Sequence, residues 1–272
     1  MRSILFLGPY GNLTTLYANI LALHPGVVGL NHARDNVPTE AAFWDGFDPQ
    51  TKLQAFKEFV ISSQSESKVG PEGGSFRQAH AARKGVVKDL ERISEYDAKS
   101  PSHVVWKESG YLTTQLRINN SIKSLLGSTH DISFVRPVRN PIHCLKTNLE
   151  SWHWKEYDDT WGNKMTYEQS CDIKTFASWY IRDLEWFLRL RGMYGSKRFI
   201  VHFESDDISN LIDHAELECS DEWLKTASDV ASNVRHRESP KDIAEAFEGL
   251  LEYYQGDEYT RITDEFIKPA LI

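Results

Sequence analysis

Short apolar runs alternate with longer stretches in which apolar residues recur at helical spacing. Five of the runs have the length and composition of buried strands, with turn or polar residues at their ends. They are residues 3–7 (SILFL), 27–30 (VVGL), 103–106 (HVVW), 131–135 (DISFV) and 198–203 (RFIVHF). Strands that alternate with helices form parallel sheets with helices on both faces. The pattern therefore predicts an α/β fold with a parallel sheet of about five strands.

The stretches between these runs predict the helices. Helical spacing extends over residues 39–61, 77–97, 111–126 and 170–192, and over a first helix directly after the 3–7 strand. The His24-Pro25-Gly26 sequence ends that first helix, and Asn140-Pro141 is a typical cap and first-turn pair for another. Residues 64–75 are rich in Gly and Ser, which predicts a mobile loop. No internal repeat or domain boundary interrupts the pattern, so we expect a single domain over residues 1–272.

Charge and composition narrow the classes of function. The 272-residue chain is 40% apolar, with a net charge of −8 and a pI near 5.7. Proteins that bind nucleic acid or anionic membranes non-specifically need a basic surface, so we expect neither partner. A polyanionic ligand would have to be held by a local cluster of cations.

Cysteine, histidine and hydropathy patterns point to a cytoplasmic protein that uses no metal. Three widely spaced cysteines suit a reducing compartment better than a disulfide framework. Neither HExxH nor CxxC occurs, so no metal site is predicted. The apolar run after Arg2 is too short for a signal peptide, and no run reaches the roughly 20 apolar residues that span a bilayer.

The segment FLGPYGNLTTL, residues 6–16, has the layout of a phosphate-binding loop. A strand, a tight turn and a helix N-terminus bring free N–H groups and the helix dipole together. The Walker A pattern fits only at Gly8 and Thr15, since Leu13 stands in place of its second glycine and Thr14 in place of its lysine. An ordinary ATP-hydrolysing site is therefore not predicted. The alternative is a plain strand–helix turn in which Thr14 and Thr15 cap the helix.

A second segment, residues 132–152 (ISFVRPVRNPIHCLKTNLESW), carries Arg139 at a strand end and Thr147 two turns into a helix. With the first loop, it resembles the sulfotransferases that use 3′-phosphoadenosine 5′-phosphosulfate (PAPS). The resemblance implies that Arg139 and Thr147 bind the 3′-phosphate, Arg139 through its guanidinium fork. It implies that the first loop binds the 5′-phosphosulfate. The loop residues concerned are Gly11, Asn12, Leu13, Thr14 and Thr15.

Three further segments occur in the order expected of that family. They are LHPGV (23–27), WKESGYL (106–112) and FIVHFES (199–205), so the resemblance covers roughly residues 4–205. It implies a P-loop NTPase-like architecture. It also implies transfer of a sulfuryl group, without a metal, to the hydroxyl or amine of a small molecule or carbohydrate.

The loop has no lysine or arginine, although the family usually has a basic residue there. Lys107, at the end of the third predicted strand, is the first choice for the missing cation, with a solvated lysine as the alternative. Arg136 is a second choice, although its position before Pro137 also suits a structural role. Arg235 and Arg237 form a basic island in an acidic C-terminal third. By position they resemble the family's C-terminal cofactor loop, and the alternative is a solvated helix flank.

The resemblance also directs the search for a general base. His32 follows the second predicted strand, and an imidazole near its reference pKa of about 6.5 accepts a proton at neutral pH. Asp35 and Glu40 are reserves. Trp154, Tyr157 and Trp161 lie in a polar stretch that suits the lining of an acceptor pocket.

Two other functions remain open at this stage. One is a nucleotide or phosphometabolite kinase with a degenerate loop, which the lysine-free loop and the lack of an acid after DISFV disfavour. The other is a non-catalytic nucleotide-binding protein of the same fold, which the missing loop cation favours. The sequence carries no signal for an oligomeric state.

Overall fold

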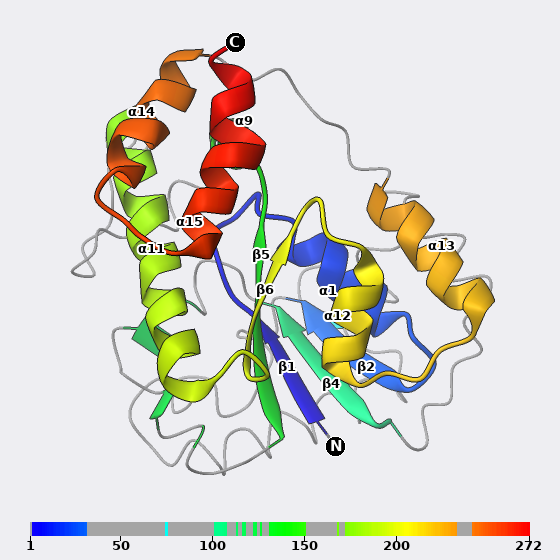
Figure 1. Ribbon diagram of the computed structural model, residues 1–272. Coiled ribbons are helices and arrows are strands. Elements are labelled where there is room, and N and C mark those ends of the chain that lie inside the picture. The colour runs from blue at the N-terminus through cyan, green and yellow to red at the C-terminus, as the bar shows by residue number, and fades with distance from the viewer. Residues whose placement is uncertain are drawn as a thin grey trace.

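A computed structural model describes most of the two ends of the chain and part of its middle. The described residues are 2–31, 74–75, 101–107, 131–150, 172–232 and 241–272, together with Thr113, Leu116, Arg117, Ile122, Lys123, Leu126 and Glu168. In these parts a central sheet lies between two layers of helices (Figure 1).

The sheet has the strand order β3-β2-β4-β1-β5-β6. The strands are β1 (Arg2–Phe6), β2 (Val27–Asn31), β3 (Gly74–Ser75), β4 (His103–Lys107), β5 (Ile132–Val138) and β6 (Phe199–Phe203). Four parallel pairs join β2, β4, β1, β5 and β6, and each of the five predicted runs falls on one of these strands. The short β3 pairs antiparallel with β2 and was not predicted. Two residues at a sheet edge leave no periodic signal in a sequence.

The helices are α1 (Thr14–Ala22), α9 (Pro141–Glu150), α11 (Ile173–Tyr194), α12 (Ile208–Ala215), α13 (Asp221–Ser232), α14 (Lys241–Leu251) and α15 (Asp257–Ile262), followed by π-helical η3 (Thr263–Ile267) and 3₁₀-helical η4 (Lys268–Ala270). The predicted 170–192 helix is α11, which begins where the Asp172 carboxylate accepts the Thr175 N–H at 2.7 Å. The described residues between 113 and 126 are helical, as predicted. The helices predicted over 39–61 and 77–97 lie outside the described residues.

Alternating side chains of β1 separate the two layers. Ile4 and Phe6 pack with α1, α12 and α13, whereas Leu5 and Leu7 pack on the other face, with part of α11. A third cluster joins α11 to α14 and the C-terminal helices. In Figure 1 these two groups of helices stand on opposite sides of the sheet. Burial on both faces is what a parallel strand requires, and it explains the uninterrupted apolar runs in the sequence.

The strand order places the first loop at the middle of the sheet. The chain leaves β1 through α1 and returns as β2, and β1 itself lies between β4 and β5. In open α/β sheets, ligands bind outside the carboxyl ends of the strands, where the strand order reverses. The segment after β1 occupies that position.

Candidate functional site

The loop after β1 has the backbone of an anion cradle. Gly8 and Gly11 have φ values of 125° and 76°, and Leu13 is left-handed with φ 59°. Leu13 is the N-cap residue of α1, and its side chain makes no capping hydrogen bond. Leu13, and not Thr14 or Thr15, therefore occupies the cap position. The first turn of α1 is left without a side-chain cap, as an anion site at a helix N-terminus requires.

Asn12 ties this loop to the end of β5. Its side chain is buried, its Nδ2 donates to the Pro137 carbonyl, and its Oδ1 accepts the Arg139 N–H at 2.9 Å. At the start of the loop, the Gly8 N–H donates to Thr113 Oγ1 at 2.7 Å. The Asn12 side chain thus positions the loop, and the Gly8 N–H is already occupied.

One face of α9 packs against the loop. The Cys144 thiol and the Asn148 amide both donate to the Tyr10 carbonyl, at 3.0 and 2.8 Å. Burial raises the pKa of Cys144 to about 12, so the thiol stays protonated and unreactive. A Cβ on Gly11 would lie 2.8 Å from the Thr147 Cβ, so only glycine fits at this position. The loop and α9 therefore form one packed unit.

Arg139 and Thr147, predicted as a phosphate-binding pair, lie together against that loop. Arg139 Nη1 donates to the Gly11 carbonyl at 3.1 Å and lies 3.5 Å from Thr147 Oγ1. Arg139 Nε lies 3.5 Å from Glu204 Oε1, and the Glu204 side chain is 3% exposed. Asn140 caps α9 as predicted, because its Oδ1 accepts the Ile142 N–H at 3.0 Å. The two predicted anion sites therefore share one edge of the sheet.

Two further basic residues flank the end of β1. Lys107 is the last residue of β4, pairs in register with Phe6 and is only 3% exposed, so it does not point to solvent. Arg136 lies on β5, on the other side of β1, and forms a buried ion pair with Asp183 of α11. Both positions proposed for the missing cation are thus buried beside the strand that leads into the loop.

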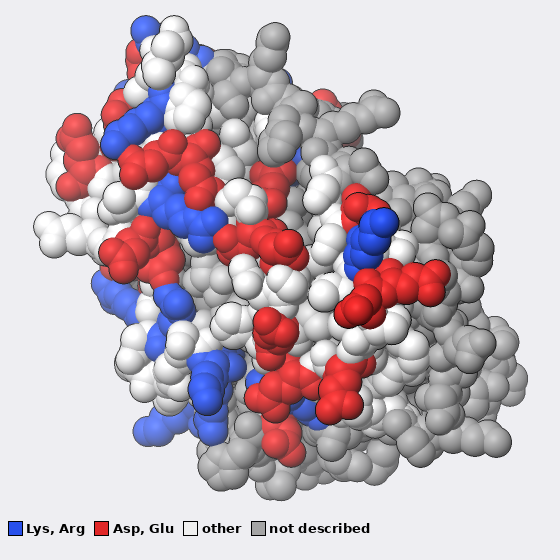
Figure 2. Space-filling view, turned by 45° about the vertical axis from the view of Figure 1, so that its right-hand side comes forward, with Lys and Arg blue, Asp and Glu red and all other residues white. Residues whose placement is uncertain are grey.

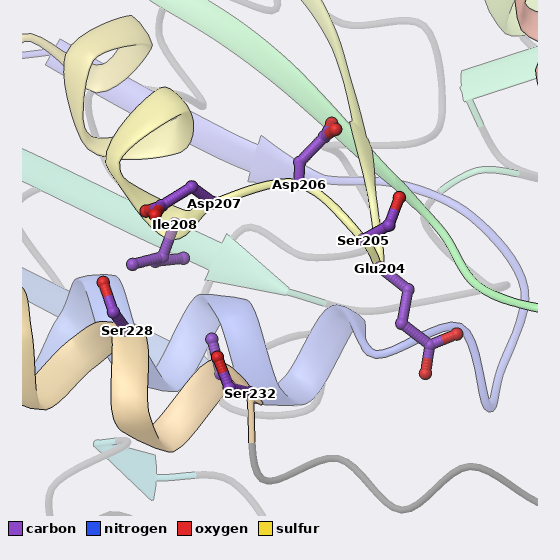
Figure 3. Close-up of a pocket in the computed structure, with 8 residues that line it drawn as sticks. Glu204, Ser205, Asp206, Asp207, Ile208, Ser228 and Ser232 are labelled. Atoms are coloured by element: carbon purple, nitrogen blue, oxygen red, sulfur yellow. The ribbon is translucent and has the colours of Figure 1, made fainter.

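A cavity of about 330 Å³ opens further along the same edge, and sequence analysis did not predict it. Its lining comes from the turn after β6 and from α13: Glu204, Ser205, Asp206, Asp207, Ile208, Ser228, Ala231 and Ser232. Figure 3 shows Ser228 and Ser232 on α13 opposite the turn that carries Glu204 to Asp207. Glu204 belongs both to this lining and to the ion pair with Arg139.

Arg261 of α15 holds that turn from its other side. Its Nη2 lies 2.5 Å from Asp206 Oδ1 and 3.0 Å from Ser205 Oγ, and its guanidinium stacks 3.9 Å above the Phe203 ring. Its Nε also bonds to Glu265, so two carboxylates share one guanidinium. Lined by carboxylates and hydroxyls, the cavity offers mainly hydrogen-bond acceptors.

Elsewhere, charges of both signs are interspersed. On the face drawn in Figure 2, acidic and basic side chains lie next to one another, with a group of basic side chains at the lower left and mainly acidic ones toward the centre. Exposed i,i+4 pairs such as Lys268–Asp264, at 2.5 Å, follow this pattern. None of the helices within the described ranges is long and apolar enough to cross a membrane. Among the same residues, no three His, Cys, Asp or Glu side chains gather as a metal site would need.

Several predicted site residues lie outside the described residues. They are His32, Arg235 and Arg237, together with the reserve bases Asp35 and Glu40 and the aromatic residues Trp154, Tyr157 and Trp161. Their assignments stay predictions. His24 is described: its Nδ1 accepts the Gly26 N–H at 3.2 Å, its Nε2 lies 2.8 Å from the Glu218 carbonyl oxygen, and its ring packs edge-on against Trp223 of α13.

Sequence analysis missed four polar residues that shape the site: Thr113, Asn148, Asp183 and Glu204. Asn148 had a usable signal, because it stands four residues after Cys144 and therefore on the same helix face as Cys144. Asp183 is a buried carboxylate within the apolar stripe of α11, and an acid in such a stripe predicts a buried partner. Glu204 lies in the FIVHFES segment that the resemblance singled out, although no role was assigned to it, and Thr113 has no comparable signal in the sequence.

Three comparisons relate the chain to known proteins. No protein-family model matches the chain, and no curated protein matches it significantly. The solved structures found are sulfotransferases, the class that the sequence motifs resemble. Sulfotransferase STF9 from Mycobacterium avium is 11% identical, with 94% of this chain and 77% of that chain covered and a TM-score of 0.46. STF1 from Mycobacterium tuberculosis H37Rv is 16% identical, with 91% and 76% covered and a TM-score of 0.45.

A third solved structure is the sulfotransferase domain of the Synechococcus PCC 7002 olefin synthase. It is 13% identical, with 94% of this chain and 95% of that chain covered and a TM-score of 0.40. The parallel α/β architecture rests on the strand order and register of the sheet itself.

Proposed function

We propose that this protein transfers a sulfuryl group from PAPS to a hydroxyl or amine acceptor. The observation that carries the proposal is the contact between two anion-binding elements at one edge of the sheet. Arg139, beside Thr147, donates to the carbonyl of Gly11 in the glycine loop at 3.1 Å. A nucleotide with an anionic group on both its 3′ and 5′ positions requires two such elements close together. The positive-φ glycines and the uncapped helix suit the 5′ group.

Each residue of the proposed site would have its own role in the transfer. The N–H groups at the start of α1, with the Thr14 and Thr15 hydroxyls, would orient the 5′ group, and the Arg139 fork would hold the 3′-phosphate. Lys107, at the end of β4, would stabilise negative charge on the leaving oxygen. His32, or else Asp35 or Glu40, would take the proton of the acceptor. When bound, PAPS supplies the activated sulfuryl group.

The cavity beyond β6 suits the nucleoside part of such a ligand. At about 330 Å³ it lies within the usual range of ligand pockets, roughly 300–1,000 Å³. Its carboxylates and serine hydroxyls accept hydrogen bonds, and its carboxylates repel phosphate, so the lining favours an amine-bearing, uncharged group such as a nucleobase. Glu204 joins this cavity to Arg139, as one continuous ligand would require. We propose a cytoplasmic location, because Cys144 and Cys219 are free thiols.

Two alternatives differ from this proposal in the ligand or in the absence of turnover. A non-catalytic nucleotide-binding protein is favoured by the absence of lysine and arginine from residues 6–16. A degenerate kinase would use the same loop for ATP. The three functions differ in ligand: a sulfotransferase binds adenosine 3′,5′-bisphosphate and turns over PAPS, a non-catalytic protein binds without turnover, and a kinase prefers ATP.

Thermal unfolding with adenosine 3′,5′-bisphosphate, ATP or AMP, followed by transfer of radiolabelled sulfuryl from PAPS to a panel of acceptors, tests the proposal. A ligand at 100 times its Kd stabilises the fold by about 2.7 kcal/mol. We expect this effect from the bisphosphate and not from AMP. Arg139→Lys should remove the stabilisation, whereas Arg191→Lys, an arginine of α11 that is ion-paired with Glu258 and lies outside both the loop and the cavity lining, should retain it. Preferential stabilisation by ATP would contradict the proposal.

A further inference from the structure

Arg136 lies directly beneath the glycine loop. The backbone fixes it there, because the Leu7 N–H donates to the Val135 carbonyl at 2.8 Å, and Arg136 is the next residue of β5. A Cβ on Gly8 would lie 3.5 Å from Arg136 Nη1 and 3.8 Å from its Cγ. The guanidinium is thus separated from the first glycine of the loop only by the space that a side chain would fill.

The Arg136 side chain is fully buried, with an exposure of 0%, yet it is not saturated with hydrogen bonds. Its Nη1 pairs with Asp183, and its guanidinium carbon lies 5.6 Å from the centre of the Tyr180 ring. Within the described parts of the chain, nothing accepts a hydrogen bond from Nε or Nη2. Burying a guanidinium with unmade hydrogen bonds costs free energy that an apolar side chain would avoid. A role in packing alone does not account for this arginine.

The carboxylate beside Arg136 does not belong to it alone. Asp183 Oδ2 bonds to Arg136, and Asp183 Oδ1 lies 3.5 Å from Arg117 Nη1. One carboxylate shared by two guanidinium groups neutralises neither completely. In a water-poor site the remaining positive potential reaches the loop with little screening. The loop itself contains no lysine or arginine from Gly8 to Thr15.

We propose that Arg136 is the cation of this lysine-free loop and holds the 5′ anion of the ligand from beneath Gly8. Because Gly8 has no side chain, the Arg136 guanidinium has room beside it. Arg136 would supply there the positive charge that a lysine within the loop would otherwise supply. Lys107 lies on β4, on the opposite side of β1 from Arg136. We therefore assign the two cations different roles. Arg136 contributes to anion affinity, and Lys107 contributes to the chemical step. The proposal rests on the proposed function only for the identity of the nucleotide.

Two variants with opposite expected effects test this role. Arg136→Met/Asp183→Asn removes the cation and its carboxylate together, so neither charge is left buried alone. Asp183→Asn alone keeps the cation and frees it from its carboxylate. Calorimetric titration with adenosine 3′,5′-bisphosphate, adenosine 3′-monophosphate and inorganic pyrophosphate reports on each part of the site. Circular dichroism checks the fold, and the double variant decides alone if Asp183→Asn does not fold.

The double variant should bind the bisphosphate and pyrophosphate about 10-fold more weakly or worse, and should bind the 3′-monophosphate as wild type does. Asp183→Asn should bind the bisphosphate several-fold more tightly. A purely structural Arg136 would give losses for all three probes, or in both variants, and would overturn the inference. Wild-type affinity for the bisphosphate in the double variant would overturn it too, while leaving the sulfotransferase proposal standing.

The same titrations also show whether the nucleotide proposal fails while the role of Arg136 holds. If the wild type binds pyrophosphate in an Arg136-dependent way but does not bind adenosine 3′,5′-bisphosphate, the nucleotide proposal fails and the role of Arg136 stands. Binding of neither probe by the wild type would contradict both.

Discussion

The carboxyl edge of the sheet has two halves that carry opposite charges. Around β1, buried Lys107 and Arg136 come from the two neighbouring strands, and Arg139 lies against the loop. Beyond β6, the turn from Glu204 to Asp207 carries three carboxylates at the cavity. Both halves are built in the same way, from residues at or just after the carboxyl ends of parallel strands. Their difference in charge therefore assigns the parts of a ligand: anionic groups to the β1 half, and the neutral nucleoside to the β6 half.

The two halves also differ in burial, which ranks the effects of substitution. Arg136 and Lys107 are 0% and 3% exposed, whereas the Arg261 side chain, which braces the acidic turn, is 36% exposed. Removing one partner of a buried ion pair costs about 3–5 kcal/mol, and a surface pair contributes about 0–1 kcal/mol. The Arg139–Glu204 pair lies where the two halves meet.

Substitution of Arg139, where the two halves meet, should have the largest combined effect, because it lowers both ligand affinity and stability. Arg139→Ala removes the guanidinium beside Gly11 and Thr147 and leaves the Glu204 carboxylate, 3% exposed, with the Asn140 N–H but without its ion-pair partner. We expect affinity for adenosine 3′,5′-bisphosphate to fall by about 100-fold or more and the free energy of unfolding to fall by about 3 kcal/mol. Titration calorimetry and urea denaturation measure the two effects.

A second substitution separates the loss of affinity from the loss of stability. Arg139→Ala/Glu204→Gln should regain stability, because no charge is left buried alone, but should not regain binding. Arg261→Ala, in the acidic half, should cost about 1 kcal/mol or less. Unchanged affinity in Arg139→Ala would show that the phosphate is held elsewhere.

Within the basic half, Lys107 should control the rate. Lys107→Met removes the ammonium at the end of β4, beside Phe6 of β1. We expect kcat for sulfuryl transfer to fall by about 100–1,000-fold, because a charge stabiliser acts mainly in the transition state. Affinity for adenosine 3′,5′-bisphosphate should change much less than in the Arg136→Met/Asp183→Asn variant. A loss of affinity with kcat unchanged would reverse the roles of the two cations.

A buried histidine of the β6 half should make the free energy of unfolding depend on pH. Burial lowers the pKa of His202 from 6.5 to about 4, and this outweighs the opposing effect of Asp206. In the unfolded chain His202 therefore takes up a proton near pH 6.5, whereas in the folded protein it does so only near pH 4. Stability should be complete above pH 6.5 and should fall by about 3 kcal/mol between pH 6.5 and 4 from this group alone.

Urea denaturation across that pH range measures the slope. His202→Asn should flatten it relative to wild type. An equal slope in His202→Asn and wild type would place the acid sensitivity outside the β6 half.

The smallest effect should come from the loop backbone. Gly11→Ala puts a Cβ 2.8 Å from the Thr147 Cβ at a φ of 76°, so we expect a loss of about 1–3 kcal/mol in the free energy of unfolding. Gly249→Ala, in α14 with nothing within 4 Å of the added Cβ, should instead gain up to about 1 kcal/mol. Calorimetric unfolding compares the two. The same strain means that Gly11→Lys should not restore a working loop cation.

The sheet could be read from the sequence because each parallel strand is buried on both faces and leaves an apolar run. The glycine loop could be read too, since Gly8 and Gly11 stand between such a run and a helical stretch. The ion pair of Arg136 with Asp183 joins positions 47 residues apart, and it depends on how α11 crosses the sheet. No local pattern encodes that crossing, so Arg136 could be named as a candidate but its buried position could not be foreseen.

The division of the edge is tested most directly by the structure of the complex with adenosine 3′,5′-bisphosphate. The account predicts the 5′-phosphate at the N–H groups of the Gly11 to Thr15 segment and above Gly8. It places the 3′-phosphate within about 3 Å of the Arg139 guanidinium. The base should lie in the cavity beside Ser228 and Ser232. A phosphate in that acidic cavity, or a ligand that makes no contact with Arg139, would contradict the account.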